Sequence, residues 1–434
     1  MNKEEIINIL KDWNFWEKKQ ETGITRELYL KRMKDYIFNE QIIIITGPRR
    51  AGKSYLMRQL IKNLIDNGIN PNETLYINFE DPRFTIKSPV LLEKIFETYM
   101  EKLMPKNKPY LFLDEIQEIN GFEKWLLMMK ELSKAKIFIS GSNAKLLSRE
   151  FGTLLTGRHL DITIFPLSFK EFLIFNGQTG MINTLEDLRY AKGLLMKYFE
   201  YGSFPEVVIS APKKEILLEY YEDIVTKDIL RRYNIRKENE LNAVLKYFFS
   251  NISTLFTYKA IERAFDISIT AVKKYSICFE QVYLLFFISR FSYKVKEQEK
   301  SPRKIYSIDT GLCNTIGFKF SDNYGRLAEN LVAISLKRKQ LLNKNLELYY
   351  WKDDVHREVD FVLKEKEKIT QLIQVCWNIS NEKTIKRETK GLAQAMNELK
   401  CKNAIIITEE ESKEIEINNS KVQIIPLWKW LLEN

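Results

Sequence analysis

Residues 47–54 form a glycine-bounded loop with the sequence Gly-Pro-Arg-Arg-Ala-Gly-Lys-Ser, which fits the pattern G-x-x-x-x-G-K-[ST]. The apolar, β-branched run Gln41–Thr46 precedes it and predicts a buried strand, and Tyr55–Ile65 follows with helical spacing. Gly47 and Gly52 allow the backbone to turn its N–H groups toward a phosphate, and the helix N-terminus adds a favourable dipole. This strand–loop–helix order predicts an α/β domain with a parallel sheet that binds a phosphorylated nucleotide.

The side chains of this loop have expected roles in nucleotide binding. Lys53 is expected to reach the β- and γ-phosphates, and the hydroxyl group of Ser54 is expected to coordinate Mg²⁺. The predicted nucleotide-binding residues are those of the loop and the residue that follows it: Gly47, Pro48, Arg49, Arg50, Ala51, Gly52, Lys53, Ser54 and Tyr55.

A second motif supports the first. Residues 110–115 read Tyr-Leu-Phe-Leu-Asp-Glu, an apolar strand that ends in two acids and looks like a Walker B motif. Asp114 would complete the Mg²⁺ shell, and Glu115 would be the general base that orients the attacking water. An apolar run that ends in Asp-Glu is otherwise a plain strand end, but its pairing with the loop at 47–54 favours the catalytic interpretation.

Several strand-like runs alternate with helical stretches, which is typical of a parallel sheet. The expected strands of this domain are Gln41–Thr46, Thr74–Phe79, Tyr110–Leu113, Lys136–Ser140 and Ile162–Phe165.

Polar residues near these strands are further candidates, because ligands bind at the carboxyl ends of parallel strands. Ser142 or Asn143 would sense the γ-phosphate, although either can equally cap a helix. Arg158 is a candidate arginine finger, in its own chain or a neighbour's, or else a surface arginine that caps a loop. Glu80 or Asp81 would contact the site, unless both are simply solvated.

Two further segments carry a family resemblance: residues 165–172, Phe-Pro-Leu-Ser-Phe-Lys-Glu-Phe, and residues 201–206, Tyr-Gly-Ser-Phe-Pro-Glu. Together with the two motifs above, they resemble a prokaryotic family of AAA-type ATPases whose C-terminal domain, of unassigned function, looks like a PD-(D/E)xK nuclease. The resemblance covers nearly the whole chain. It implies an ATP-binding and ATP-hydrolysing core of the additional-strand type, with Glu115 catalytic, and it supplies no cellular role.

The middle of the chain favours a winged-helix segment. Tyr258–Ala264 and Ile269–Glu280 are predicted helices, Ser268 would cap the second, and Tyr283–Phe291 would be the first strand of the wing. Such a helix can enter the major groove of double-stranded DNA, but similar shapes also dock proteins or act as lids.

Basic residues of this segment are the candidate DNA contacts. Lys273 and Lys274 would face phosphate from the second helix, although two lysines are also ordinary on a solvated helix face. The run from Lys294 to Lys304 is predicted to be a flexible turn that assists binding. Its basic residues are Lys294, Lys296, Lys300, Arg303 and Lys304.

The last hundred residues resemble the nuclease fold in pattern. Glu329 lies on a predicted helix and Asp360 on a predicted strand, but Gln374 and Cys376 stand where a working member would have Glu-x-Lys. Glutamine cannot supply the missing negative charge, and a neutral cysteine cannot replace an ammonium group. Lys383 or Lys386 would substitute only if the chain folded back. We therefore expect a degenerate binding or packing domain.

Composition limits the remaining choices. Lys and Arg exceed Asp and Glu by 68 to 58, an excess that permits an anionic partner without requiring one. Two histidines exclude a multi-His metal centre, and four widely spaced cysteines indicate reduced thiols. The charged N-terminus and the lack of an apolar run of about 20 residues predict a cytoplasmic protein without a membrane span.

The chain is expected to divide into a helical leader (1–36), an ATPase core (37–175), a helical lid or linker (176–235), a winged-helix domain (236–312) and a nuclease-like domain (313–434). The leading hypothesis is a Mg²⁺-dependent ATPase whose ATP or ADP state controls the last two domains, with DNA, a partner protein and a second copy of the chain as candidate partners. One alternative is a slow nucleotide-dependent switch without a DNA role. A less favoured one is an active DNA nuclease.

Overall fold

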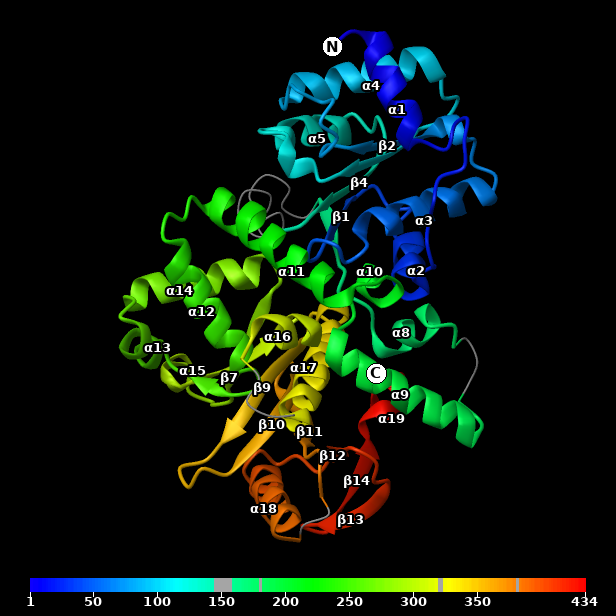
Figure 1. The fold of residues 1–434 in the computed structure, drawn as a ribbon. Helices are drawn as coiled ribbons and strands as arrows, with labels where there is room; N and C mark the ends of the chain where they lie inside the picture. Colours follow the sequence, from blue (N-terminus) through cyan, green and yellow to red (C-terminus); the bar gives the residue numbers. More distant parts are fainter. Residues whose placement is uncertain (144–157, 179–181, 319–322, 380–381) are drawn as a thin grey trace. The chain divides into compact units, whose positions relative to one another are not determined.

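The computed structural model describes residues 1–143, 158–178, 182–318, 323–379 and 382–434, and it divides the chain into two compact units (Figure 1). The first unit is Met1–Ile164 and the second is Phe165–Asn434. The division falls at the end of the fifth predicted strand, eleven residues before the predicted end of the ATPase core at 175.

The first unit is built on a sheet of five parallel strands in the order β2-β3-β4-β1-β5. The strands are β1 (Ile42–Thr46), β2 (Thr74–Asn78), β3 (Tyr110–Asp114), β4 (Lys136–Gly141) and β5 (His159–Thr163). The five predicted strands are confirmed, although β5 begins three residues earlier than expected. Strand β4 lies between β1 and β3, which is the additional-strand arrangement that the resemblance implied.

Helices cover both faces of this sheet because alternate residues of each strand are buried on opposite sides. Helices α1 (Lys3–Trp13), α4 (Pro89–Leu103) and α5 (Phe122–Glu131) lie over one face, where Ile42 and Ile44 point (Figure 1). Helices α2 (Glu27–Asp35) and α3 (Lys53–Asp66) cover the other, where Ile43 and Ile45 point. Two short 3₁₀ turns, η1 (Pro71–Glu73) and η2 (Ile116–Glu118), complete the unit.

The second unit contains a mixed sheet of nine strands in the order β13-β14-β12-β11-β10-β9-β7-β8-β6. The strands are β6 (Leu255–Phe256), β7 (Leu285–Arg290), β8 (Arg303–Ser307), β9 (Leu346–Lys352), β10 (Glu358–Glu365), β11 (Lys368–Val375), β12 (Ala404–Thr408), β13 (Lys413–Ile417) and β14 (Ser420–Pro426). Strand β7 pairs with β8 antiparallel and with β9 parallel. The sheet therefore continues across the predicted domain boundary at 312/313.

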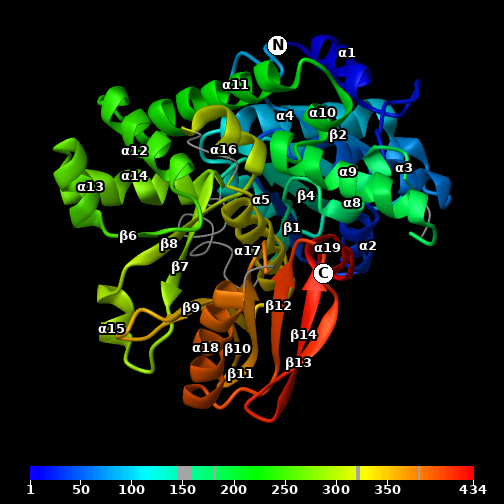
Figure 2. The same ribbon diagram turned by 60° about the horizontal axis from the view of Figure 1, so that its bottom comes forward.

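Helices make up the rest of the second unit. They are α8 (Phe169–Phe175), α9 (Leu185–Tyr201), α10 (Pro205–Ile209), α11 (Lys213–Asp223), the π-helical turn η3 (Ile224–Arg231), α12 (Glu238–Ser250), α13 (Tyr258–Phe265), α14 (Ile269–Gln281), α15 (Val295–Lys300), α16 (Thr310–Ile316), α17 (Tyr324–Leu342), α18 (Glu382–Glu398) and α19 (Leu427–Glu433). Helices α17 and α18 pack on opposite faces of the sheet, α17 against Phe361 and Ile373 and α18 against Val362 and Leu372 (Figure 2).

The expectation of a flexible turn between Lys294 and Lys304 is wrong. The described structure has helix α15 in this stretch, and strand β8 begins at Arg303. The strand pairs with β7 through Ile305 and Lys304, so its backbone is fixed by the sheet.

The two segments that carry the family resemblance have local structural roles. Ser168 and Glu171 form a reciprocal capping box at the start of α8, with backbone-to-side-chain bonds of 2.8 and 3.2 Å. Gly202 has a φ of 72°, and a Cβ atom there would lie 2.0 Å from the carboxylate of Asp309. Ser203 donates its backbone N–H to the same carboxylate at 2.6 Å. Burial of Asp309 raises its pKa to about 6.

Candidate nucleotide-binding site

The loop at 47–54 leaves the carboxyl end of β1 and leads directly into α3. Gly47 has a φ of 144°, and a Cβ atom there would lie 2.1 Å from the carbonyl oxygen of Ile164. Gly52 has a φ of 97°, in the region that favours glycine. Both glycines of the motif are therefore required by the backbone geometry. The helix starts at Lys53, so its unsatisfied N–H groups face the loop.

The side chain of Lys53 points into the loop and is only 4% exposed. Its ammonium group donates to the carbonyl oxygens of Gly47 at 3.3 Å and Pro48 at 3.2 Å, and it lies 3.5 Å from the carboxylate of Glu115. A positive charge on a buried side chain inside a loop of backbone N–H groups is the arrangement that binds polyphosphate.

Asp114 ends strand β3 and is held by hydroxyl groups from both neighbouring strands. Tyr76 on β2 donates to Oδ2 of Asp114 at 2.5 Å, and Ser140 on β4 donates to Oδ1. Burial, together with the charge of Asp114, raises the pKa of Tyr76 well above its ordinary value, so the phenol keeps its proton and stays a donor. Neither Tyr76 nor Ser140 was predicted as a site residue.

Glu115 follows in the left-handed region, with a φ of 51°. Its backbone N–H donates to the Ser140 hydroxyl at 3.0 Å, and Gln117 donates to its carboxylate. The Glu115 carboxylate lies 3.5 Å from the Lys53 ammonium group. The structure therefore brings together Lys53, Asp114 and Glu115, the three residues on which the catalytic prediction depends.

The remaining residues of the predicted loop differ in exposure. Ser54 is half-buried at the start of α3, and Ala51 is fully buried. Tyr55 is 44% exposed. Arg49 forms an ion pair of 2.7 Å with Glu80, which confirms that the end of β2 lies beside the loop.

Arg26, from the N-terminal leader, supports the loop. Its guanidinium group donates to the carbonyl oxygen of Ala51 at 2.8 Å, and its backbone N–H donates to Gln59 on α3 at 3.1 Å. The side chain of Gln59 in turn donates to the carbonyl oxygens of Thr22 and Ile24. The leader is thus attached to the loop, a role that no sequence motif indicated.

The other polar candidates near the sheet have different positions. Ser142 and Asn143 are both buried just beyond the carboxyl end of β4, the edge that carries the loop. Asp81 accepts hydrogen bonds from Trp13 at 2.8 Å and from Arg83, which holds its pKa at about 2. Asp81 therefore anchors the leader.

Arg158 lies at the amino ends of the strands, whereas the loop at 47–54 follows the carboxyl end of β1. It precedes β5, and its carbonyl oxygen accepts a hydrogen bond of 3.1 Å from Ile42, the first residue of β1. Its guanidinium group pairs with Glu131 at 2.5 Å. Because β1 and β5 run parallel and the loop follows the other end of β1, Arg158 cannot serve as an arginine finger in its own chain. A role in a neighbouring chain stays a prediction.

Of the residues predicted for the degenerate nuclease-like site, Glu329, Asp360 and Gln374 lie close together in the second unit, and Lys304 joins them. Glu329 on α17 and Asp360 on β10 both bind the ammonium group of Lys304, at 3.0 and 2.8 Å. Gln374 on β11 accepts the backbone N–H of Asp360 at 3.3 Å. Cys376 lies beyond the strand, with its thiol 3.6 Å from the carbonyl oxygen of Asn378. The prediction that Lys304 contacts DNA is wrong, since its side chain is 1% exposed.

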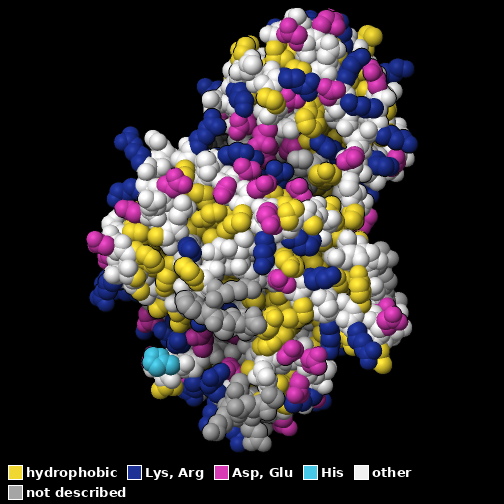
Figure 3. Space-filling model, in the orientation of Figure 1, with side chains coloured by type: hydrophobic (Ala, Val, Ile, Leu, Met, Phe, Trp, Pro, Cys, Tyr) yellow, Lys and Arg dark blue, Asp and Glu magenta, His cyan; other side chains and the backbone are white. Residues whose placement is uncertain are grey.

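The basic residues predicted to contact DNA are otherwise at the surface. Lys273 and Lys274 are exposed on α14, where Ser268 caps the helix by accepting the N–H of Ala271 at 3.3 Å. The ammonium group of Lys273 lies 5.6 Å from the centre of the Tyr258 ring. Lys and Arg side chains are interspersed with acidic ones over the face shown in Figure 3. The excess positive charge is therefore not gathered into one stripe on that face.

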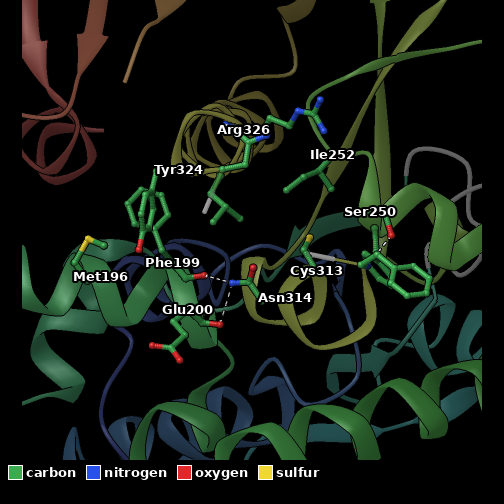
Figure 4. Close-up of a pocket in the computed structure, with 13 residues that line it drawn as sticks. Met196, Phe199, Glu200, Ser250, Ile252, Cys313, Asn314, Tyr324 and Arg326 are labelled. Carbon is green, nitrogen blue, oxygen red and sulfur yellow. Dashed lines mark hydrogen bonds between the residues drawn. The ribbon is translucent and has the colours of Figure 1, made fainter. Parts of the chain in front are cut away.

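A cavity of about 370 Å³ lies in the second unit, among α9, α12, α16 and α17 (Figure 4). Phe199, Cys313 and Tyr324 are among its lining residues. Asn314 donates to the carbonyl oxygens of Phe199 and Glu200 at 2.7 and 3.1 Å. This polar side chain of the lining already has protein partners, so the cavity does not identify a ligand.

Two further observations concern membrane-spanning helices and the cysteine residues. In the described part of the chain, no helix has both the length and the apolar character needed to cross a membrane. All four cysteines are buried thiols.

Comparisons with protein families divide the chain into three matched segments. Residues 39–173 match an AAA domain. Residues 192–322 and 324–430 each match a domain of unknown function, DUF8612 and DUF4143. The nuclease-like and winged-helix assignments thus receive no support from these matches.

Two relatives are similar over nearly the full length. An uncharacterized protein of Methanocaldococcus jannaschii is 34% identical over 428 residues, covering 94% of this chain and 91% of the relative. An uncharacterized protein of Haemophilus influenzae is 30% identical over 419 residues, covering 94% of this chain and 99% of the relative.

Among solved structures, AMPPCP-bound DnaA from Aquifex aeolicus matches at 16% identity and a TM-score of 0.28, covering 62% of this chain and 93% of that one. The Orc1 protein of Aeropyrum pernix in complex with DNA matches at 11% identity and a TM-score of 0.32, covering 71% and 93%. TM-scores this low support no inference about function.

Proposed function

Since the chain belongs to the same family as these archaeal and bacterial proteins, and carries the AAA-type P-loop ATPase domain at residues 39–173, we propose that it is a Mg²⁺-dependent ATPase. The observation that carries the proposal is the convergence of Lys53, Asp114 and Glu115 at one edge of the parallel sheet, with Lys53 3.5 Å from Glu115.

The residues fit a phosphate and a divalent cation. The backbone N–H groups of Gly47 and residues 49–53, together with the Lys53 ammonium group, would bind the β- and γ-phosphates. Lys53 would then give up its contacts with the carbonyl oxygens of the loop. Ser54 and Asp114 would hold Mg²⁺, which supplies charge neutralisation on the phosphate oxygens. Tyr76 and Ser140 would keep the carboxylate of Asp114 in one orientation.

Glu115 would act as the general base. Once the Lys53 ammonium group turns to phosphate, the Glu115 carboxylate would accept a proton from water as the water oxygen attacks the γ-phosphorus. The bond from the γ-phosphorus to the bridging oxygen breaks, and ADP and phosphate leave. Asn143, buried beyond the end of the neighbouring strand β4, would contact the γ-phosphate.

The test is hydrolysis by Glu115→Gln. We expect a loss of kcat on the order of 100-fold or more with ATP binding retained, because the glutamine keeps the shape but cannot take the proton. The matched control is Glu118→Gln, which removes an acid three residues further on that pairs with Lys87 at 2.5 Å. Wild-type turnover by Glu115→Gln would contradict the assignment. Slow wild-type turnover with nucleotide retained through purification would favour a nucleotide-dependent switch instead.

We further propose that nucleotide state controls the second unit, and that α13, α14 and the β7–β8 hairpin form a winged helix whose exposed Lys273 and Lys274 contact DNA phosphates. This extension is supported by the order of the elements, two helices joined by a short turn and followed by an antiparallel pair.

A further inference from the structure

Lys304 is a buried lysine at the centre of the acid cluster in the second unit. It lies on β8, and only 1% of its surface is exposed. Its ammonium group is 2.6 Å from Glu358, 2.8 Å from Asp360 and 3.0 Å from Glu329. An ammonium group has three N–H donors, so three carboxylates use its full donor capacity.

Each carboxylate of the cluster has a second partner. Tyr306 donates to Glu329 at 2.7 Å, and the backbone N–H of Val375 donates to the other oxygen of Asp360 at 2.9 Å. The second oxygen of Glu358 pairs with Lys352 at 3.0 Å. Both oxygens of Asp360 and both oxygens of Glu358 therefore have protein partners, while Lys304 and Tyr306 share Oε1 of Glu329.

The electrostatics favour a cation at this place. Burial alone would lower the pKa of Lys304, but the charges of Asp360 and Glu329 outweigh that effect and raise it well above its ordinary value. Burial, then the charge of Asp360, raises the pKa of Glu329 to about 8. Lys304 and Lys352 thus bring two positive charges into contact with the three carboxylates.

The position of Lys304 differs from that of the lysine in the Glu-x-Lys pattern. The pattern would place the lysine at position 376, directly after the strand that carries Gln374, whereas Lys304 comes from a strand of the preceding family segment. Gln374 instead donates to Glu388 at 2.8 Å, so it faces a neighbouring acid rather than a cation.

We propose that the Lys304 ammonium group is the resident cation of this cluster, in the place where a nuclease-like site would hold a divalent metal ion, so that the second unit binds no metal there and does not cleave DNA. A phosphodiester has no access to a cation that is 1% exposed and surrounded by three carboxylates. The inference is independent of the proposed ATPase activity.

Mn²⁺ binding to nucleotide-free, full-length protein tests the proposal. All variants carry Asp114→Asn, so that the candidate Mg²⁺ site of the first unit does not contribute. We expect no Mn²⁺-dependent rise in Tm for this parent protein. Lys304→Gln should lower Tm, and Mn²⁺ should restore part of the loss, with an affinity at least tenfold tighter than in the control Lys300→Gln. Lys300 is exposed on α15, four residues away in sequence.

Two results would overturn the proposal. One is Mn²⁺ binding or Mn²⁺-dependent plasmid nicking by the parent protein that Asp360→Asn abolishes. The other is a Lys304→Gln protein with unchanged Tm and no gain in Mn²⁺ affinity. If Lys304→Gln does not fold, the parent protein and its Asp360→Asn variant still decide the question, because the proposal requires that neither binds Mn²⁺ or nicks DNA.

Discussion

The hydroxyl group of Tyr76 donates a 2.5 Å hydrogen bond to Oδ2 of Asp114 from the adjacent strand, and it does so inside the core. Strand pairing sets this contact, since β2 and β3 are in register with Asn78 opposite Asp114. Ser140 holds the other oxygen from the opposite side. Asp114 therefore has one available orientation before any ligand binds.

Removal of this hydroxyl by Tyr76→Phe should weaken the use of Mg²⁺. A hydrogen bond to a charged group contributes about 1.5–3 kcal/mol, so we expect roughly a 10-fold or greater increase in the Mg²⁺ concentration that gives half-maximal ATPase activity. The measurement is a Mg²⁺ titration of hydrolysis at saturating ATP. Tyr99→Phe is the matched control, because Tyr99 is a buried tyrosine that donates to the carbonyl oxygen of Asn72, away from the site. Equal Mg²⁺ requirements in the two variants would show that Tyr76 has no positioning role.

Charge removal on α14 should weaken DNA binding if the winged-helix proposal is right. The double variant Lys273→Gln/Lys274→Gln loses two exposed charges, so log K for double-stranded DNA should depend less steeply on log salt, by about 1.8 in slope if both contact phosphate. Fluorescence anisotropy at several salt concentrations measures this slope. Lys390→Gln/Lys400→Gln removes two exposed charges from elsewhere in the unit as the control. An unchanged slope would assign Lys273 and Lys274 to the solvated surface.

Gly202→Ala should destabilise the second unit strongly. The added Cβ would lie 2.0 Å from the carboxylate of Asp309, at a φ of 72° that alanine disfavours. We expect a loss of about 2–4 kcal/mol in the free energy of unfolding, measured with urea. Gly193→Ala on α9 is the control, because a Cβ atom there meets nothing within 4 Å, and this variant should gain up to about 1 kcal/mol. A Gly202→Ala protein as stable as Gly193→Ala would refute the clash.

Asp309 should make the stability of the second unit fall as pH rises. Its folded-state pKa of about 6 lies above the ordinary value of 3.8, so the folded state binds the proton more tightly. The favourable contribution is complete below about pH 4 and is lost as the pH passes 6, with a total on the order of 3 kcal/mol. Asp309→Asn should lack this loss, and the difference between the two unfolding free energies from pH 4 to 7 measures it. Parallel curves would show that Asp309 does not titrate in this range.

Much of the first unit was predictable from sequence because its strands are continuous apolar runs that end in polar residues. Asp114 and Glu115 come at the end of such a run. Their position at the carboxyl ends of the strands could therefore be predicted once the strands were taken to be parallel. Tyr76 was missed because a tyrosine within an apolar strand looks like core, and only strand register places it beside Asp114. Arg158 was predicted to be an arginine finger in its own chain or a neighbour's, yet it precedes β5, and in a parallel sheet the start of a strand lies opposite the end that carries the loop.

The second unit was harder to predict because its contacts join distant segments. Lys304 follows a series of exposed lysines, so its neighbours suggested an exposed residue. Its burial depends on the pairing of β8 with β7 and on carboxylates that lie 25 to 56 residues further along the chain. Glu329 and Asp360 were correctly grouped, whereas the cation between them was not foreseen.

The nine-stranded sheet also bears on how such proteins can be recombined. Residues 192–322 and 324–430 match separate families, yet β7 from the first pairs with β9 from the second, and Lys304 from the first neutralises acids from the second. A chimaera that exchanged only one of these segments would expose a strand edge and leave a buried charge without its counter-charge. The two segments should therefore be inherited and transplanted as a pair, with the join placed before residue 192.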